Sequence, residues 1–187
     1  MHSGLIVLST SKKEQVLQMT KNASIELLEE TRSMHALLET CKEICKLTEI
    51  SEINAWLDLE INGYLIKYKT RAELYQSLPS YRKTGWKFYD LYGNLITLPP
   101  DMMSLFGKST VYHPVRELEN REQIILESQF LDEFNKFILD HGIDTISKNL
   151  RIHDARISKN EINLVLEGVK KRIQEFLDNI ISLLELE

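Results

Sequence analysis

The sequence predicts an α+β fold that is mainly α, namely a helical bundle with a small antiparallel sheet and a long C-terminal helix. Two early segments, 33–47 and 53–63, repeat apolar residues at helical spacing. Residues 86–98 are rich in aromatic and β-branched side chains around Gly93-Asn94, which is typical of a β-hairpin. The last 30 residues repeat apolar side chains in steps of four and three, which predicts one long helix.

The length and composition favour one globular domain. The chain has 187 residues, of which 43% are hydrophobic and 27% are charged, and it has only 7 Gly and 4 Pro, so long flexible linkers are not expected. Residues 1–23 are polar and lack a clear period, apart from a short helical run near residues 14–19, and we expect them to form a loosely attached N-terminal arm. Residues 24–187 are expected to form a single domain. The net charge of −5 argues against a general nucleic-acid coat protein but leaves room for a local basic patch.

The N-terminal half is expected to be helical. A short helix begins at Ser24, and Ser33 is expected to cap the helix that follows it. A third helix contains Ile53 to Ile61 and ends at Asn62-Gly63, because these residue types tolerate the left-handed conformation found after a helix.

The middle of the chain alternates turns with short elements. Leu78 to Arg82 is expected to be an extended turn, because proline disfavours helix in the residue before it. After the hairpin we expect a short helix at 101–106, a strand at 109–113, a helix at 124–139 that ends at Gly142, and one strand or a bent pair of strands at 145–157.

The C-terminal helix has a clear start signal. Ser158 and Glu161 have the spacing of a capping box. The apolar stripe extends over about 30 Å at 1.5 Å per residue. Its members are Ile162, Leu166, Val169, Ile173, Phe176, Ile180 and Leu183. This stripe is a candidate surface for a partner helix or for self-association.

No catalytic or metal-binding motif is recognisable. The five histidines are scattered, and Cys41 and Cys45 have no second pair to complete a tetrahedral site, so we expect no metal and no cofactor. The two thiols fit a reducing compartment. Because no apolar run is long enough for a signal peptide or a membrane span, a cytoplasmic protein without membrane contact is expected.

One region combines aromatic and basic residues. The basic-aromatic window, residues 64–92, contains eight of the 15 aromatic residues, and its six basic and two acidic residues give it a local charge of +4. Three interpretations stay open. The rings pack a core beneath a solvated face, the window forms a protein interface, or it binds single-stranded nucleic acid.

Three short motifs resemble the AbiTii family. They are the segment Trp56 to Tyr64 with the pattern W-x-x-x-E-x-N-G-Y, the segment Leu78 to Arg82 with the pattern L-P-x-Y-R, and Leu98-Pro99-Pro100, and a terminal helix ending Leu-Leu-Glu-Leu-Glu accompanies them. The resemblance spans roughly residues 24–187. It implies a role in bacterial abortive infection, a defence against phage, and it supplies no catalytic residues.

The motif residues are the candidate binding residues. They are Trp56, Glu60, Asn62, Gly63, Tyr64, Pro79, Tyr81, Arg82 and Trp86. We interpret Glu60 and Arg82 as an ion pair that holds the helical and sheet halves together, with a recognition site as the alternative.

Three functions are therefore considered. The first is a non-enzymatic defence component that acts through protein–protein interaction, with a protein partner or a second copy held by the C-terminal helix. The alternative is a toxic effector that binds RNA or DNA through residues 64–92. A third hypothesis is an enzyme that uses Glu60, His113 and Tyr81.

Overall fold

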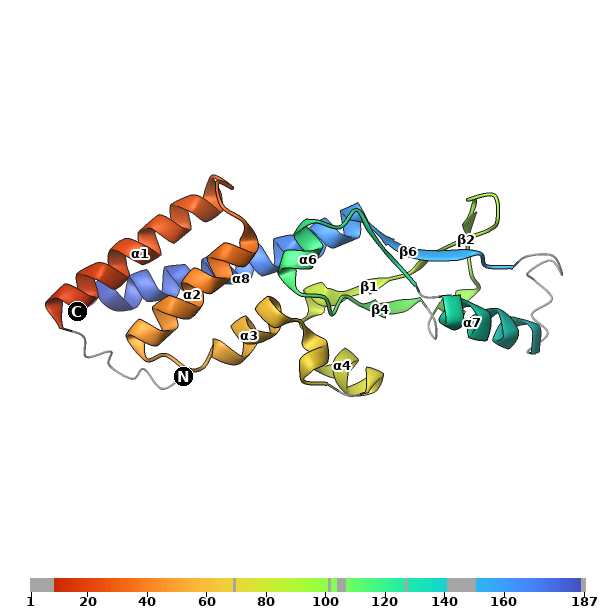
Figure 1. Ribbon diagram of the computed structural model, residues 1–187, viewed down its shortest axis with the longest axis horizontal. Coiled ribbons are helices and arrows are strands. Elements are labelled where there is room, and N and C mark those ends of the chain that lie inside the picture. Colours follow the sequence, from red (N-terminus) through yellow and green to blue (C-terminus); the bar gives the residue numbers. More distant parts are fainter. Residues whose placement is uncertain are drawn as a thin grey trace. The chain divides into compact units, whose positions relative to one another are not determined.

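The computed structural model describes residues 9–68, 70–100, 102–103, 107–126, 128–140 and 151–185 (Figure 1). The chain forms two compact units. The first, unit 1, comprises Met1–Ser77, Tyr112–Asn120 and Val165–Glu187, and the second, unit 2, comprises Leu78–Val111 and Arg121–Leu164. That residues 24–187 fold as a single domain stays a prediction.

The regular elements in the described part of unit 1 are all helices. Its elements are α1 (Thr10–Leu28), α2 (Met34–Thr48), α3 (Asn54–Asn62), the short 3-10 helix η1 (Tyr64–Ile66), α4 (Arg71–Ser77), α6 (Val115–Glu119) and most of α8 (Lys159–Glu185). The expected end of the third helix is confirmed, since α3 ends at Asn62 and Gly63 follows with φ of +87°. Helix α6 was not predicted from the sequence.

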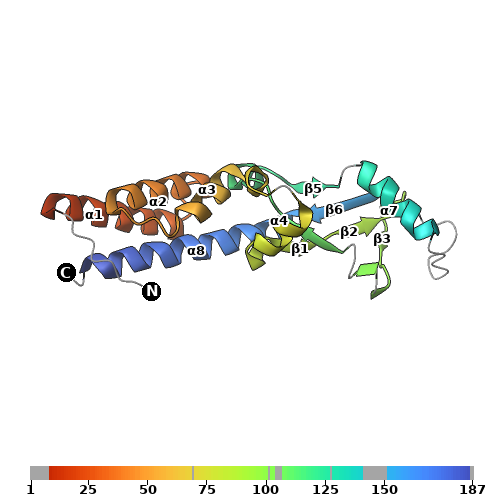
Figure 2. The ribbon, with the colours of Figure 1, turned by 90° about the horizontal axis from the view of Figure 1, so that it is seen from below.

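The prediction of a loosely attached arm is wrong for the residues from Thr10 onward, because these residues form helix α1 and bury part of its surface. Its buried residues, Val16, Thr20, Ala23 and Leu27, are spaced by four, three and four positions and so lie on one face. The side-chain amide of Gln174 donates to the Ser24 hydroxyl at 3.2 Å, which ties α1 to α8. The two helices run side by side in Figure 2.

The N-terminus of α2 is capped twice. As predicted, the Ser33 hydroxyl accepts a hydrogen bond from the Ala36 amide at 3.2 Å. The carboxylate of Glu119, at the end of α6, also accepts from the amides of Met34 at 2.5 Å and His35 at 3.4 Å. This carboxylate satisfies amides that have no partner inside the helix, and its charge is favourable at the positive end of the helix dipole.

Replacing Glu119 with alanine is therefore expected to lower the free energy of unfolding by about 1–2 kcal/mol, because two helix-end amides lose a charged acceptor. Urea unfolding followed by circular dichroism measures the change. The matched control is Glu119→Gln, whose side-chain oxygen can still accept from the two amides but carries no charge. A Glu119→Ala protein as stable as the unmodified chain would show that this cap contributes nothing.

The long C-terminal helix is confirmed, and so is the half of the predicted capping box in which Glu161 reaches back to Ser158. The Ser158 amide donates to the Glu161 carboxylate at 2.7 Å at the start of α8, which continues to Glu185. Most of the apolar stripe is buried. Five of its seven residues are buried, namely Ile162, Val169, Ile173, Phe176 and Ile180, and the neighbouring Val165, Leu177 and Leu184 are buried as well. Leu183 is 40% exposed. Because most of the other stripe residues are buried, the chain itself covers most of the surface that was expected to bind a partner.

All described strands lie in unit 2 and pair antiparallel. Strands β1 (Lys83–Gly85) and β4 (Lys108–Thr110) form a two-stranded sheet. A four-stranded sheet has the order β3-β2-β6-β5, from β2 (Lys87–Tyr89), β3 (Leu95–Ile96), β5 (Gln123–Ile125) and β6 (Asp154–Ser158). The predicted hairpin is confirmed as β2 and β3, and the strand predicted at 109–113 is the shorter β4.

The helix predicted at 124–139 begins later than expected. Ile124 and Ile125 belong to β5, which pairs with β6, and α7 runs from Ser128 to Asp140. The predicted helix 101–106 and the end at Gly142 lie largely outside the described residues. In the strand region predicted at 145–157, residues 145–150 are also outside the described residues. The strand found in the described remainder is β6, from Asp154 to Ser158.

Helix α7 covers one face of the four-stranded sheet. Phe88 of β2 and Phe134 of α7 have ring centroids 5.3 Å apart. Their cluster also includes Ile96, Leu98, Met102, Leu131, Ile138, Ile152 and Ala155. The buried Asn135 side chain completes this packing by bonding both the amide and the carbonyl of Ile152, at 2.9 and 2.8 Å. Within the described part of the chain, no helix is long and apolar enough to cross a membrane.

Candidate recognition surface

The Trp56–Tyr64 motif forms a buried hydrogen-bond cluster in unit 1. Glu60 is fully buried, and its Oε1 accepts from the Trp56 ring Nε1 at 3.0 Å and from the Tyr64 hydroxyl at 2.7 Å. Trp56 and Tyr64 lie one helical turn before and after Glu60, so a single carboxylate joins three residues of one segment. The Arg172 guanidinium of α8 lies 4.5 Å above the Trp56 ring, in the range of a cation–π contact.

Gly63 fixes the bend between α3 and Tyr64. Its φ of +87° and ψ of 158° suit glycine far better than residues with a side chain. A Cβ atom on Gly63 would lie 3.1 Å from the Pro114 ring and 3.2 Å from the Tyr112 carbonyl oxygen. The Tyr64 amide donates to that same oxygen at 2.9 Å. The neighbouring Asn62 is exposed and bonds its own helix at the Asp58 carbonyl, at 3.0 Å. The motif residues of unit 1 therefore have structural contacts.

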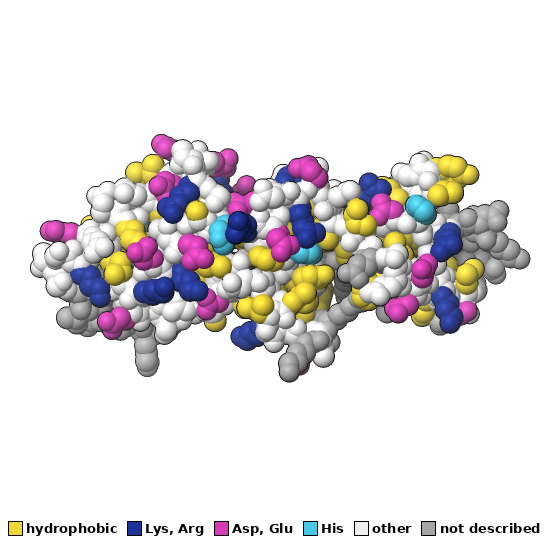
Figure 3. Space-filling model, viewed as in Figure 1, with side chains coloured by type: hydrophobic (Ala, Val, Ile, Leu, Met, Phe, Trp, Pro, Cys, Tyr) yellow, Lys and Arg dark blue, Asp and Glu magenta, His cyan; other side chains and the backbone are white. Residues whose placement is uncertain are grey.

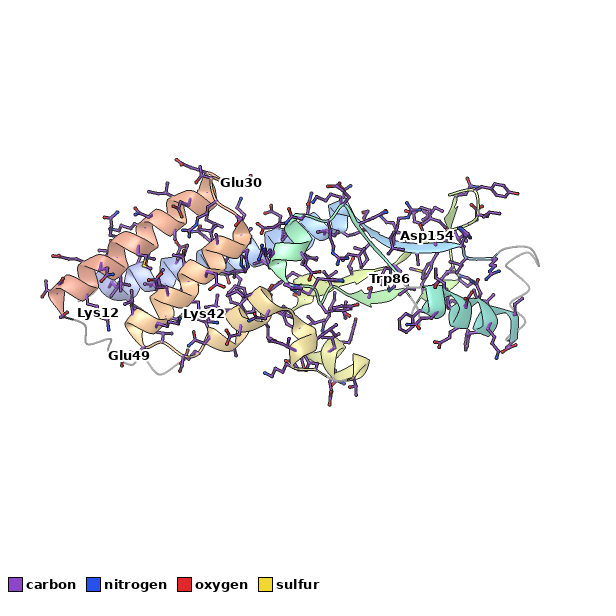
Figure 4. The ribbon with its side chains drawn as sticks, in the orientation of Figure 1. Lys12, Glu30, Lys42, Glu49, Trp86 and Asp154 are labelled. Atoms are coloured by element: carbon purple, nitrogen blue, oxygen red, sulfur yellow. The ribbon has the colours of Figure 1, made fainter. Side chains whose placement is uncertain are left out.

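The L-P-x-Y-R segment lies in unit 2. Arg82 is fully buried, its guanidinium donates to the Val111 carbonyl at 2.7 Å, and its own carbonyl accepts from the Val111 amide at 2.9 Å. Pro79 precedes a short 3-10 helix, Ser80–Arg82, and Tyr81 is half-buried. Trp86, labelled in Figure 4, is half-buried and packs against the hydrophobic cluster that contains Phe88 and Phe134. The Glu60–Arg82 ion pair joins residues of different units and stays a prediction.

The basic-aromatic window presents only part of its rings and cations at the surface. The exposed Lys67 ammonium lies 5.6 Å from the centroid of the half-buried Tyr68 ring. Tyr64 and Phe88 are buried, and among its eight aromatic side chains Tyr92 alone is largely exposed, at 85%. Arg82 is buried, and the Lys87 ammonium is 2.6 Å from the Glu161 carboxylate. The window also divides between units 1 and 2. The described residues therefore support the interpretation in which much of this segment packs internally.

The side of the four-stranded sheet opposite α7 is a second candidate recognition surface. Side chains alternate across a strand, so the neighbours of the buried residues point away from α7. We call this side the open sheet face. It carries Leu95, Lys87, Tyr89, Asp154, Arg156, Ser158, Gln123 and Ile125. Leu95 and Ile125, on the two edge strands, are 60% and 56% exposed.

Charges on the open sheet face are paired with opposite charges. The Arg156 guanidinium contacts the Asp154 carboxylate and stacks over the Tyr89 ring, 4.2 Å from its centroid. The hydrogen bond with Glu161 raises the pKa of Lys87. Burial acts to raise the pKa of Glu161, but hydrogen bonds from Lys87 and Ser158 outweigh it and hold this pKa below its ordinary value. The two pairs contain two basic and two acidic groups, so together they give no excess of either sign.

The sequence did not identify this surface. Lys87 and Tyr89 fell inside the basic-aromatic window, whereas Asp154 (labelled in Figure 4) and Arg156 were part of a region expected to hold one strand or two. Strand pairing places Tyr89 opposite Asp154 and Lys87 opposite Arg156. The alternation of charged and apolar residues from Asp154 to Ser158 was the available signal of a strand with one open side.

Cys41 and Cys45 behave as core residues. Both are free thiols inside α2, with 0% and 1% exposure. Burial raises the pKa of Cys41 to about 12 and that of Cys45 to about 11. Across the described residues, no group of three His, Cys, Asp or Glu side chains is arranged to hold a metal ion.

Neither thiol is expected to react with iodoacetamide at pH 8 in the folded protein, because the reactive thiolate is scarce and the reagent has no access. In denaturant both thiols should react. Mass spectrometry counts the carbamidomethyl groups added to the folded and to the denatured protein. Rapid modification of both cysteines in the folded protein would contradict this prediction.

Comparison with known proteins gives one positive result. No curated protein and no solved structure matches the chain. The AbiTii family model matches residues 24–182, which includes the three motifs and most of α8. This match covers most of the chain, so the protein belongs to the AbiTii family, whose members act in bacterial abortive infection against phage.

Proposed function

We propose that this protein is a non-enzymatic component of its abortive-infection system and acts by binding a protein partner through the open sheet face. One observation carries the proposal. The face centres on a stacked tyrosine–arginine pair, Tyr89 and Arg156, between partly exposed edge strands. Tyrosine and arginine are enriched among the residues that contribute most binding energy in protein interfaces.

The paired charges favour a protein over a nucleic acid. Nucleic-acid binding depends on cations that neutralise phosphates. On the open sheet face, each of the two cations, Lys87 and Arg156, already contacts a carboxylate. Basic side chains are likewise interspersed with acidic ones on the side of the molecule seen in Figure 3. A surface with alternating charges suits a protein partner of complementary pattern.

Two further observations support binding without catalysis and a location in the cytoplasm. Glu60, the carboxylate considered for an enzymatic role, is fully buried and already accepts two hydrogen bonds, so a substrate has no access to it. Cys41 and Cys45 are unpaired thiols, which suits the reducing cytoplasm.

We place the partner on the open sheet face in preference to the α8 stripe. The stripe was expected to offer apolar surface for a second copy or a partner helix. Its main residues are buried within the chain itself, and the exposed leucines of the described part of α8 are Leu164 and Leu183.

Phage challenge of bacteria that produce charge-reversed variants tests the proposal. Lys87→Glu and Arg156→Glu are expected to reduce protection at least about tenfold, because each reverses a charge at the centre of the surface. Arg151→Glu is the matched control, since Arg151 is 73% exposed and pairs with Asp132 away from the open sheet face. Protein levels and urea unfolding must match among the variants.

The alternative is an effector that binds RNA or DNA. Fluorescence anisotropy with labelled single-stranded oligonucleotides at low salt separates the two functions. We expect no binding. Binding that weakens steeply with salt and is lost in Arg156→Glu would replace the protein-partner proposal with the nucleic-acid one. Full protection by both charge-reversed variants would remove the open sheet face from either function.

A further inference from the structure

The β2–β3 hairpin ends in an exposed apolar tip. The loop residues Leu91 and Tyr92 are 67% and 85% exposed, and Leu95, the first residue of β3, is 60% exposed. Apolar side chains are common on surfaces singly, but three large ones at one turn form a cluster. Because Leu95 pairs with Tyr89, the tip continues from the open sheet face.

The tip is held in one conformation by Asp90. Its Oδ1 accepts from the amides of Tyr92 and Asn94, both at 2.8 Å, and its Oδ2 accepts from the Asn94 side-chain amide at 2.9 Å. The Asp90 amide donates to the Asn94 carbonyl at 3.0 Å, and the Gly93 amide donates to the Asp90 carbonyl at 3.1 Å. Gly93 has φ of +80°, as in a three-residue hairpin loop with a left-handed last residue.

An ordered apolar projection loses little conformational entropy when it binds. We propose that the Leu91–Tyr92–Leu95 tip inserts into an apolar pocket of the protein partner that covers the open sheet face. This inference rests on the proposed function and adds the anchor through which the partner is held. Tyr92 is the central anchor, because an aromatic ring brings a large apolar area and a hydroxyl that stays at the polar rim.

A protein pocket suits this tip better than an anionic lipid surface. Asp90, at the base of the loop, carries a negative charge, and the hydrogen bond from Asn94 lowers its pKa. The two cations of the adjoining open sheet face, Lys87 and Arg156, are paired with Glu161 and Asp154. Anionic membranes attract surfaces with unpaired lysine and arginine residues.

The test compares Tyr92→Ala and Leu91→Ala with Leu139→Ala in full-length protein. Leu139 is a 75% exposed leucine of α7 in the same unit and serves as the matched control. All three variants should unfold at the same urea concentration as the unmodified chain, because the removed side chains bury little area. We expect Tyr92→Ala to reduce phage protection at least about tenfold and Leu139→Ala to leave it unchanged.

Several outcomes separate this inference from the proposed function. If Arg156→Glu abolishes protection and Tyr92→Ala retains it, the tip is not an anchor although the open sheet face still binds. If neither variant changes protection, both proposals are wrong. Sedimentation with phosphatidylglycerol vesicles tests whether the tip binds a lipid surface instead of a protein pocket. Binding of the unmodified chain that Tyr92→Ala abolishes would make a lipid the occupant and overturn the protein pocket.

Discussion

Replacing Glu60 with alanine is expected to lower the free energy of unfolding by about 2–5 kcal/mol, one of the two largest effects of any single change considered for this protein. Glu60 is fully buried, and its Oε1 accepts hydrogen bonds from the Trp56 ring and the Tyr64 hydroxyl. Alanine leaves both donors without this acceptor, and each buried unsatisfied polar group costs roughly 1–3 kcal/mol. Alanine also leaves a cavity where the carboxylate was.

Urea unfolding of Glu60→Ala measures the loss, and Glu60→Gln is the matched control. The glutamine side chain keeps an oxygen at the same distance from the backbone, so it still accepts from Trp56 and Tyr64, and its loss should be smaller. Tryptophan fluorescence gives a second readout, because the environment of Trp56 changes when its Nε1 loses the carboxylate. An alanine variant within about 0.5 kcal/mol of the unmodified chain would show that this cluster does not stabilise the fold.

Replacing Gly63 with alanine is expected to cost about 2–4 kcal/mol. Two effects add at this position. The backbone conformation, with φ of +87° and ψ of 158°, is strained for any residue with a side chain. The new Cβ atom also lies 3.1–3.3 Å from atoms of Pro114 and Tyr112, which must shift to make room.

Gly93→Ala separates these two effects. Gly93 also has a positive φ, +80°, but a Cβ atom placed there would have no atom within 4 Å. Alanine at Gly93 should therefore cost only the backbone strain of about 1–2 kcal/mol. Urea midpoints of the two variants compare them directly. Equal losses at both positions would show that the contacts of Gly63 with Pro114 and Tyr112 have no effect on stability.

The elements predicted correctly are those whose signals are local. Ser33 lies three residues before the amide that it caps, and Ser158 and Glu161 are equally close together. The hairpin is likewise specified by a short sequence, in which Gly93 supplies the positive φ that the turn needs. These signals act over a few residues, so the sequence alone displays them.

The elements that were missed depend on residues far apart in the sequence. Helix α1 buries the small or polar residues Thr20 and Ala23 between Val16 and Leu27, so its buried face does not form a recognisable apolar stripe. Ile124 and Ile125 suit a strand or a helix equally, and their pairing with β6 decides between the two.

The candidate site was only partly predictable for the same reason. The aromatic and basic residues of 64–92 were apparent in the sequence, but their burial was not. Arg82, which had the charge expected of a recognition residue, is buried. The open sheet face requires the antiparallel pairing of β2 with β6, which brings Tyr89 beside Asp154 and Arg156. This pairing depends on the folded chain as a whole.

A single comparison tests most directly whether the family motif is a scaffold while recognition takes place on the open sheet face. Phage protection and the free energy of unfolding are measured together for Glu60→Gln and Arg156→Glu. Arg156→Glu should remain folded and lose protection, whereas Glu60→Gln should protect in proportion to the folded protein that remains and recover at lower temperature. A Glu60→Gln protein of undiminished stability that gives no protection, beside an Arg156→Glu protein that protects fully, would contradict the account and place the recognition site in the motif.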